Sequence, residues 1–252
     1  MTTLDELVSY TDTLLNSAAF QDYCPNGLQV EGRREVRRLM SGVTACQALV
    51  DAAVAAGADA VLVHHGYFWK DEDPRVTGMK RRRLAALLAA DVSLIAYHLP
   101  LDAHPELGNN AQLARALGLP VEGWFGGGRG PDLACHGRLP AARGAADLAA
   151  DIGNALGREP QFITGGDHPV LRVGWCTGAA QSYITAAAAL GLDAFISGEI
   201  SEQTVHVARE CGIHFYAAGH HATERFGVRA LGEHLAACFG LEHTFVDIAN
   251  PV

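Results

Sequence analysis

The chain has 252 residues, of which 49% are hydrophobic, and its formal net charge is −9 at pH 7. This length and apolar content suit one large α/β domain or two small ones with a full core. Proteins that follow a nucleic-acid backbone are normally basic, so this acidic chain is not expected to bind nucleic acid. The basic run at 80–83 is interpreted as the solvated face of a helix.

The N-terminal residues and the cysteines together predict a cytoplasmic protein. The first residues have neither the basic nor the apolar region of a signal peptide. No apolar stretch approaches the roughly 18 residues that a membrane span needs, so no membrane contact is expected. The six cysteines are scattered without a C-x-x-C pair, and several lie in apolar runs, as buried free thiols do.

In the first half of the chain, hydrophobic patterns predict strands that alternate with helices. A helix is expected over 3–16, with Thr3 as its N-cap and Glu6 three residues later. Gly57 is expected to end a second helix. A proline-broken loop is expected over 99–105. The other expected elements are strands at 27–32, 38–43, 58–63 and 92–98, and helices at 45–56, 80–90 and 110–117.

The glycine-rich stretch at 123–130 is interpreted as a flexible connection between two halves of the chain. It lacks the glycine spacing of a phosphate-binding loop in a strand–helix setting, so that alternative is disfavoured. The predicted division is therefore a first α/β lobe over 1–125 and a second over 126–252. The C-terminal part of the second lobe is expected to return metal ligands to a shared site.

The second half of the chain repeats the first in outline. A shift of 134 residues places the Gly57-x-Asp59-Ala60 element on Gly191-x-Asp193-Ala194, before another apolar strand. A strand at 213–218, a helix at 222–239 and a strand at 241–248 follow. The predicted fold is α/β, with two pseudo-symmetric lobes that each have a mixed sheet flanked by helices. A metal site is expected in the cleft between the lobes, where small-molecule sites are common.

Metal-ligating residue types gather where predicted strands end. Each group alone has a structural explanation: Glu224 suits a helix N-terminus, Asp102 suits a turn, and His98 suits a core position. Three groups at three strand ends favour a metal site, with one or two ions left open. If a helix begins by His220, then His220 and Glu224 share one face. The groups are His64-His65, His98 with Asp102, and His220-His221 with Glu224.

Several stretches match one known family in order along nearly the whole chain. They are Pro25–Val30, Val63–Gly66, Tyr97–Asp102, Gly108–Asn110, Ser197–Ile200 and Gly219–Arg225. On these stretches the sequence resembles the Nif-three-like dinuclear-metal proteins, which include the homologues of type 2 GTP cyclohydrolase I. The short distance between the halves matches the short form of the family, without the inserted domain.

The resemblance implies a site with two divalent metal ions, expected to be zinc, iron or manganese. It implies that Glu224 bridges the ions and that His98 is a nearby or additional ligand. It also implies a ring-shaped homohexamer whose sites face an interior cavity. The implied ligands are His64, His65, Asp102, His220 and Glu224.

Two classes of function follow from such a site. The first is a metal-dependent hydrolase acting on a small molecule, either opening the imidazole ring of a purine nucleotide, as in a GTP cyclohydrolase, or cleaving a phosphoester. His98, Glu199 and His206 are candidates for the acid–base, although each residue type is more often structural. The second class is a non-catalytic metal-binding assembly or adaptor. Five ligands shared by two ions leave coordination positions open, which favours catalysis.

A zinc protease is a third interpretation of the same residues. Such enzymes need two histidines with a glutamate in the H-E-x-x-H pattern. The segment from His220 to Glu224 lacks the second histidine at that spacing, so this class is discounted.

Overall fold

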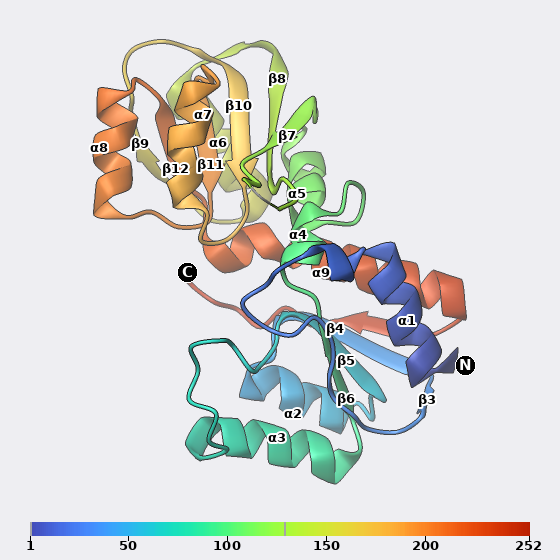
Figure 1. The fold of residues 1–252 in the computed structure, drawn as a ribbon. Helices are drawn as coiled ribbons and strands as arrows, with labels where there is room; N and C mark the ends of the chain where they lie inside the picture. Colours follow the sequence, from blue (N-terminus) through green and yellow to red (C-terminus); the bar gives the residue numbers. More distant parts are fainter. Residues whose placement is uncertain (1, 129) are drawn as a thin grey trace. The chain divides into compact units, whose positions relative to one another are not determined.

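The computed structural model describes residues 2–128 and 130–252 (Figure 1). The chain forms two compact units. The first contains the residues up to Leu101 together with Val228–Ala249, and the second contains Asp102–Gly227 with Asn250–Val252. The chain passes between the units within two helices, α4 (Leu99–Ala103) and α9 (His220–Phe239), and once more after Ala249.

The first unit is built on a five-stranded mixed sheet in the order β13-β4-β5-β6-β2. Strands β13, β4, β5 and β6 are parallel, and β2 is antiparallel to β6. Helices α2 and α3 cover one face of this sheet and α1 lies on the other (Figure 1). The strands are β2 (Gly27–Val30), β4 (Arg38–Thr44), β5 (Ala60–His65), β6 (Ser93–Ala96) and β13 (Glu242–Phe245), and the helices are α1 (Leu4–Leu14), α2 (Gln47–Ala55) and α3 (Gly78–Ala90).

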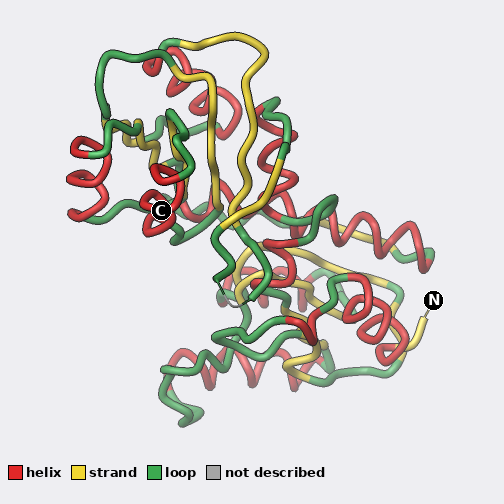
Figure 2. The backbone as a smooth tube through the Cα atoms, turned by 45° about the horizontal axis from the view of Figure 1, so that its top comes forward, coloured by secondary structure: helices red, strands yellow, loops and turns green. Residues whose placement is uncertain are grey.

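The second unit has a six-stranded mixed sheet in the order β7-β8-β10-β11-β12-β9, with its three central strands parallel. Helices α5 and α6 pack on one face and α7 and α8 on the other, so both faces are covered. Figure 2 distinguishes the strands of each sheet from the helices around them. The strands are β7 (Gly123–Phe125), β8 (Ala134–Arg143), β9 (Gln161–Ile163), β10 (Val170–Cys176), β11 (Ala194–Ser197) and β12 (His214–Ala217), and the helices are α5 (Asn109–Leu117), α6 (Ala145–Leu156), α7 (Ile184–Ala189) and α8 (Glu202–Glu210).

The repeat predicted from the sequence is present in both units. Gly57 and Gly191 each end a helical segment with a positive φ, at 63° and 67°. Asp59 and Asp193 follow, and each carboxylate accepts hydrogen bonds of 2.7–2.9 Å from two consecutive backbone N–H groups near the start of the preceding parallel strand. The same aspartate–backbone hydrogen bonds therefore occur just before strand β5 in the first sheet and strand β11 in the second.

The capping prediction for the first helix is confirmed. Thr3 and Glu6 form a reciprocal capping box at the start of α1. The expectation of a loop over 99–105 is wrong, because Leu99–Ala103 forms the short helix α4. Pro100 lies in its first turn, where a helix leaves backbone N–H groups without intrahelical partners, so a proline is tolerated there.

The boundaries of the two units differ from the predicted boundary between residues 125 and 126. The chain enters the second unit at Asp102, because the apolar face of α5 completes the core of that unit. The glycine-rich stretch does not connect the units: Gly123–Phe125 is strand β7, paired with β8 inside the second unit. Arg129 lies outside the described residues. Among the helices described, none is long and apolar enough to cross a membrane.

Candidate metal centre

In the first unit, two neighbouring parallel strands bring three histidines together. Strand β5 ends at His64 and His65, and His98 comes two residues after β6. Because the carboxyl ends of parallel strands meet at one edge of a sheet, these side chains converge. One ring nitrogen of each histidine lies within 4.8 Å of the others. His64 is fully buried.

Hydrogen bonds to the Nδ1 atoms orient these imidazoles. Nδ1 of His64 donates to the backbone carbonyl of Tyr97 at 2.9 Å, so Nε2 carries the lone pair that a metal ligand needs. Nδ1 of His98 donates to Oδ1 of Asp22 at 2.7 Å. Nδ1 of His65 lies 3.2 Å from Oγ1 of Thr44. Histidines that bind metals are typically held in this way through the nitrogen that does not coordinate.

Asp22 has a role that the sequence analysis missed. Its carboxylate accepts hydrogen bonds from His98, from Nδ2 of Asn26 at 2.9 Å and from the backbone N–H of Leu99 at 2.9 Å. Burial alone would raise the pKa of Asp22, but its hydrogen bonds and the charge of His98 outweigh this and hold the pKa below its usual range. The only sequence signal for Asp22 is its place before the Pro25-Asn26-Gly27 turn.

The second unit brings together the remaining predicted ligands. Helix α9 begins at His220, so His220 and Glu224 share a face, and Nε2 of His220 lies 3.1 Å from Oε2 of Glu224. Nδ1 of His220 donates to Oε1 of Glu199, which follows β11, at 2.6 Å. A carboxylate oxygen of Asp102 lies within 4.8 Å of one of Glu224. Asp102 and Glu224 are both buried.

The carboxylates around His220 favour a positive charge on its imidazole. Burial by itself lowers the pKa of His220, but the hydrogen bonds and charges of Glu224 and Glu199 outweigh it and raise the pKa to about 9. The carboxylates therefore stabilise a positive charge at this point. A divalent ion would compete with that proton for the same imidazole.

Neutral side chains fix the carboxylate of Asp102. Nδ2 of Asn109 donates to Oδ1 of Asp102 at 2.8 Å, and the hydroxyl of Thr177 donates to the same oxygen at 3.3 Å. Oδ1 of Asn109 in turn accepts the backbone N–H of Gly227 at 3.1 Å. Neither Asn109 nor Thr177 was among the residues predicted for the site. The sequence signal for Asn109 was its place in the Gly108–Asn110 stretch that matches the family, seven residues after Asp102.

The carboxylate of Glu224 lies against the backbone at Gly178, where only a glycine leaves room for it. Gly178 has a φ of +67°, and a Cβ there would overlap the carboxylate of Glu224 and lie 3.2 Å from Nε2 of His220. Buried carboxylates and oriented imidazoles suit a divalent ion such as zinc, iron or manganese. The donor set therefore fits the metals that the resemblance implies.

The three acid–base candidates have different surroundings. His98 belongs to the histidine cluster of the first unit, and Glu199 contacts His220 in the second. His206 is exposed on α8 and belongs to none of the clusters of metal-ligating side chains found in the described part of the chain.

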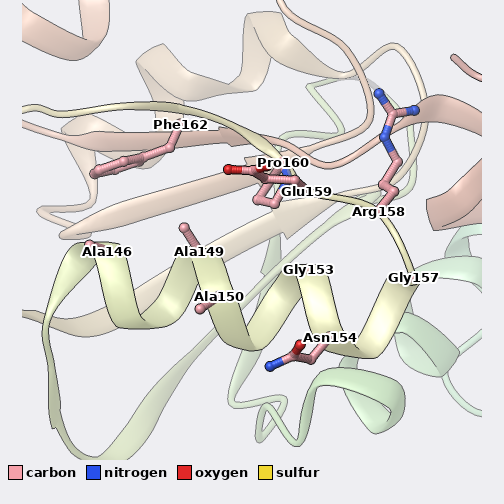
Figure 3. A pocket seen from close by; sticks show the side chains of 10 residues that line it. All are labelled: Ala146, Ala149, Ala150, Gly153, Asn154, Gly157, Arg158, Glu159, Pro160 and Phe162. Atoms are coloured by element: carbon pink, nitrogen blue, oxygen red, sulfur yellow. The ribbon is translucent and has the colours of Figure 1, made fainter.

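A separate pocket of about 560 Å³ lies in the second unit, between α6 and the segment that leads into β9. Figure 3 shows Ala149 on α6 directed toward Phe162 and Pro160 across this pocket. None of the predicted metal ligands lines it. The pocket is therefore not the candidate metal centre.

These features define an α/β protein with oriented imidazole and carboxylate clusters that could bind metal ions. The model of the Duf34/NIF3 (NGG1p interacting factor 3) family matches residues 2–251. The chain belongs to this family, which confirms the resemblance seen in the sequence.

Two curated relatives are named "GTP cyclohydrolase 1 type 2 homolog". The one from Pseudomonas aeruginosa is 59% identical over 248 residues, and the one from Escherichia coli K12 is 56% identical over 247 residues. In both cases the match covers 98% of this chain and 98% of the relative.

Solved structures show the same fold. A structural-genomics protein, ybgI, of unknown function matches with a TM-score of 0.95 and 55% identity, covering 100% of both chains. The protein TTHA1606 from Thermus thermophilus matches with a TM-score of 0.89 and 36% identity, also over 100% of both chains.

Proposed function

We propose that the protein is a metal-dependent hydrolase that holds two divalent ions. In this proposal Glu224 bridges the two ions. One observation carries this proposal. In both units, hydrogen bonds orient predicted ligands and leave a second ring nitrogen or carboxylate oxygen of each side chain for the metal. The proposed ligands are His64, His65, Asp102, His220 and Glu224.

The composition of this ligand set favours catalysis over a purely structural role. Structural zinc sites are closed by four protein ligands, whereas five ligands for two ions leave positions for water and substrate. Asp102 and Glu224 only partly neutralise two divalent ions, so the site would attract an anionic group. When bound, such ions lower the pKa of water and stabilise charge on the group that is attacked. A non-catalytic metal-binding adaptor would not need these open positions.

Two side chains beside the proposed ligands have distinct roles in this proposal. The carboxylate of Asp22 holds Nδ1 of His98, which leaves the other ring nitrogen to accept and return a proton during hydrolysis. Glu199 orients His220 through Nδ1 and acts as a positioning residue. His206 is exposed, so we give it no part in the reaction.

The proposed substrate is a small anionic molecule. The relatives' names point to GTP, for which the reaction would be hydrolytic opening of the purine imidazole ring with loss of formate. Cleavage of a phosphoester at the same ligands uses the same activation of water. Assays of formate release and of phosphate release distinguish these reactions.

Metal content per chain tests the proposal first. We expect about two ions in the wild type and at most one in Glu224→Gln, because the substitution removes the bridging carboxylate. Glu233→Gln is the matched control, since Glu233 lies on the same helix but is exposed and paired with Arg229 at 2.8 Å. A wild type that holds no more than one ion, even after incubation with zinc, iron or manganese, would contradict the two-ion site.

A further inference from the structure

Two aromatic side chains, Tyr23 and Trp69, lie beside the histidines of the first unit, and Phe68 precedes Trp69 in the chain. Tyr23 is 62% exposed, Phe68 is 36% exposed, and Trp69 is half-buried. We call Tyr23 and Trp69 the aromatic wall. Exposed aromatic rings leave apolar area in water, so such a group on one part of a surface calls for an explanation.

The aromatic wall lies beside the proposed metal ligands. The ring centroid of Trp69 is 5.1 Å from that of His98 at an interplanar angle of 84°, and 6.0 Å from that of His65. The ring of Tyr23 lies 6.4 Å from that of His98 at 65°. A molecule that reached these histidines would therefore pass next to the aromatic rings.

Hydrogen bonds join the two loops that carry the wall. The backbone N–H of Lys70 donates to the carbonyl of Tyr23 at 2.7 Å. The side chain of Gln29 bridges both loops, since it accepts the N–H of Tyr67 at 2.7 Å and donates to the carbonyl of Pro25 at 2.8 Å. The backbones of the two loops are therefore held together before any ligand arrives, which lowers the entropic cost of ordering them on binding.

Phe68 is held in a backbone conformation that bulky residues avoid. Its φ is +64°, in the left-handed region where glycine is usual. Its N–H donates to Oε2 of Glu72 at 3.1 Å, and Nζ of Lys80 lies 5.1 Å from its ring centroid. Strained residues of this kind cluster at ligand sites, and this one directly precedes Trp69 of the wall.

We propose that the aromatic wall binds a planar heteroaromatic ring of the substrate by stacking on Tyr23 and Trp69. The wall would then select substrates that carry such a ring over ringless anions, a choice that the metal ligands cannot make. This inference rests on the proposed function, because the ring would be placed beside the proposed metal ligands. Stacking on an aromatic side chain is tolerant of the identity of the base, so it selects a class of ring and not one nucleotide.

Binding of GTP and of inorganic triphosphate to the metal-loaded protein tests the wall. We expect Tyr23→Leu and Trp69→Leu each to weaken GTP binding about tenfold and to change triphosphate binding less than about twofold. Tyr23→Phe and Trp69→Phe keep a ring and should bind GTP like the wild type. Metal content and the unfolding temperature of each variant report whether the site and the fold are intact.

The inference would be overturned if the leucine variants weakened binding of GTP and of triphosphate equally. It would also be overturned if the leucine and phenylalanine variants changed GTP binding by the same factor, or if the wild type bound GTP no tighter than triphosphate. The wall would then only shield His98 from solvent. Hydrolysis of a ringless phosphoester separates this failure from that of the proposed function. If that activity is present while GTP has no advantage, only the wall fails. If no hydrolysis occurs but ring binding depends on the wall, only the hydrolase proposal fails.

Discussion

A methyl group at Gly178 should disrupt the candidate metal centre from the backbone side. The loop after β10 holds Gly178 at a φ of +67°, and its added Cβ would overlap the carboxylate of Glu224. The loop cannot easily move away. The N–H of Gly178 donates to Oγ1 of Thr223 at 3.1 Å, and its carbonyl accepts the N–H of Gly198 at 2.9 Å. Glu224 and His220 would have to shift instead.

The expected magnitude has two parts. Alanine in the left-handed region costs about 1–2 kcal/mol of stability wherever it occurs. Gly118→Ala provides the matched control, because Gly118 has a φ of +65° and its added Cβ would meet no atom within 4 Å. The control should show the backbone cost alone. Gly178→Ala should show that cost, and in addition a loss of about 10–100-fold in metal affinity, as when groups around metal ligands are displaced.

Denaturant unfolding of the metal-free proteins and titration with zinc against a chelator measure the two parts separately. We expect Gly118→Ala to bind zinc as the wild type does, despite its lower stability. Equal zinc affinity of Gly178→Ala and Gly118→Ala would refute the argument that the space at Gly178 serves Glu224.

Two other predictions concern pH and assembly. Burial lowers the pKa of His214 below 6.5, so the unfolded state binds its proton more readily and the free energy of unfolding should fall as the pH drops below about 6.5. His214→Gln keeps an acceptor for the N–H of Gly165 and a donor for the carbonyl of His168, but it does not titrate. Denaturant unfolding of the metal-free variant between pH 7.5 and 5.5 should therefore show less loss of stability with acid than the wild type. If the free energy of unfolding of the variant falls with pH as steeply as that of the wild type, His214 is not the group responsible. We also propose the ring-shaped hexamer, for which light scattering should give about 160 kDa from chains of 26.7 kDa. A mass of one or two chains at micromolar concentration would contradict it.

Local patterns predicted much of the secondary structure because they act over a few residues. Thr3 and Glu6 satisfy the first N–H groups of α1 regardless of the rest of the chain. The repeated Gly-x-Asp-Ala element marks the start of a buried strand in both units, since its aspartate binds backbone groups nearby in the fold. The histidine pair at 64–65 could be predicted as metal-binding because it lies at the end of such a strand.

The limits of the two units were decided by packing. Leu113 on α5 is buried with Trp175 and other core residues of the second unit, so the chain crosses before α5 and not after it. Near the C-terminus, β13 pairs with β4, which returns this part of the chain to the first unit. Composition pointed instead to the glycine-rich stretch, because glycines mark linkers and tight turns alike.

The sequence by itself determined the residue types that could bind metals and the helical spacing of His220 and Glu224. Only the tertiary structure decided which side chains support them. Asp22 reaches His98 across 76 residues, and Thr177 reaches Asp102 across 75. Such pairs leave no period or spacing in the chain, because a hydrogen bond depends on the distance between two atoms in space and not on their separation along the sequence.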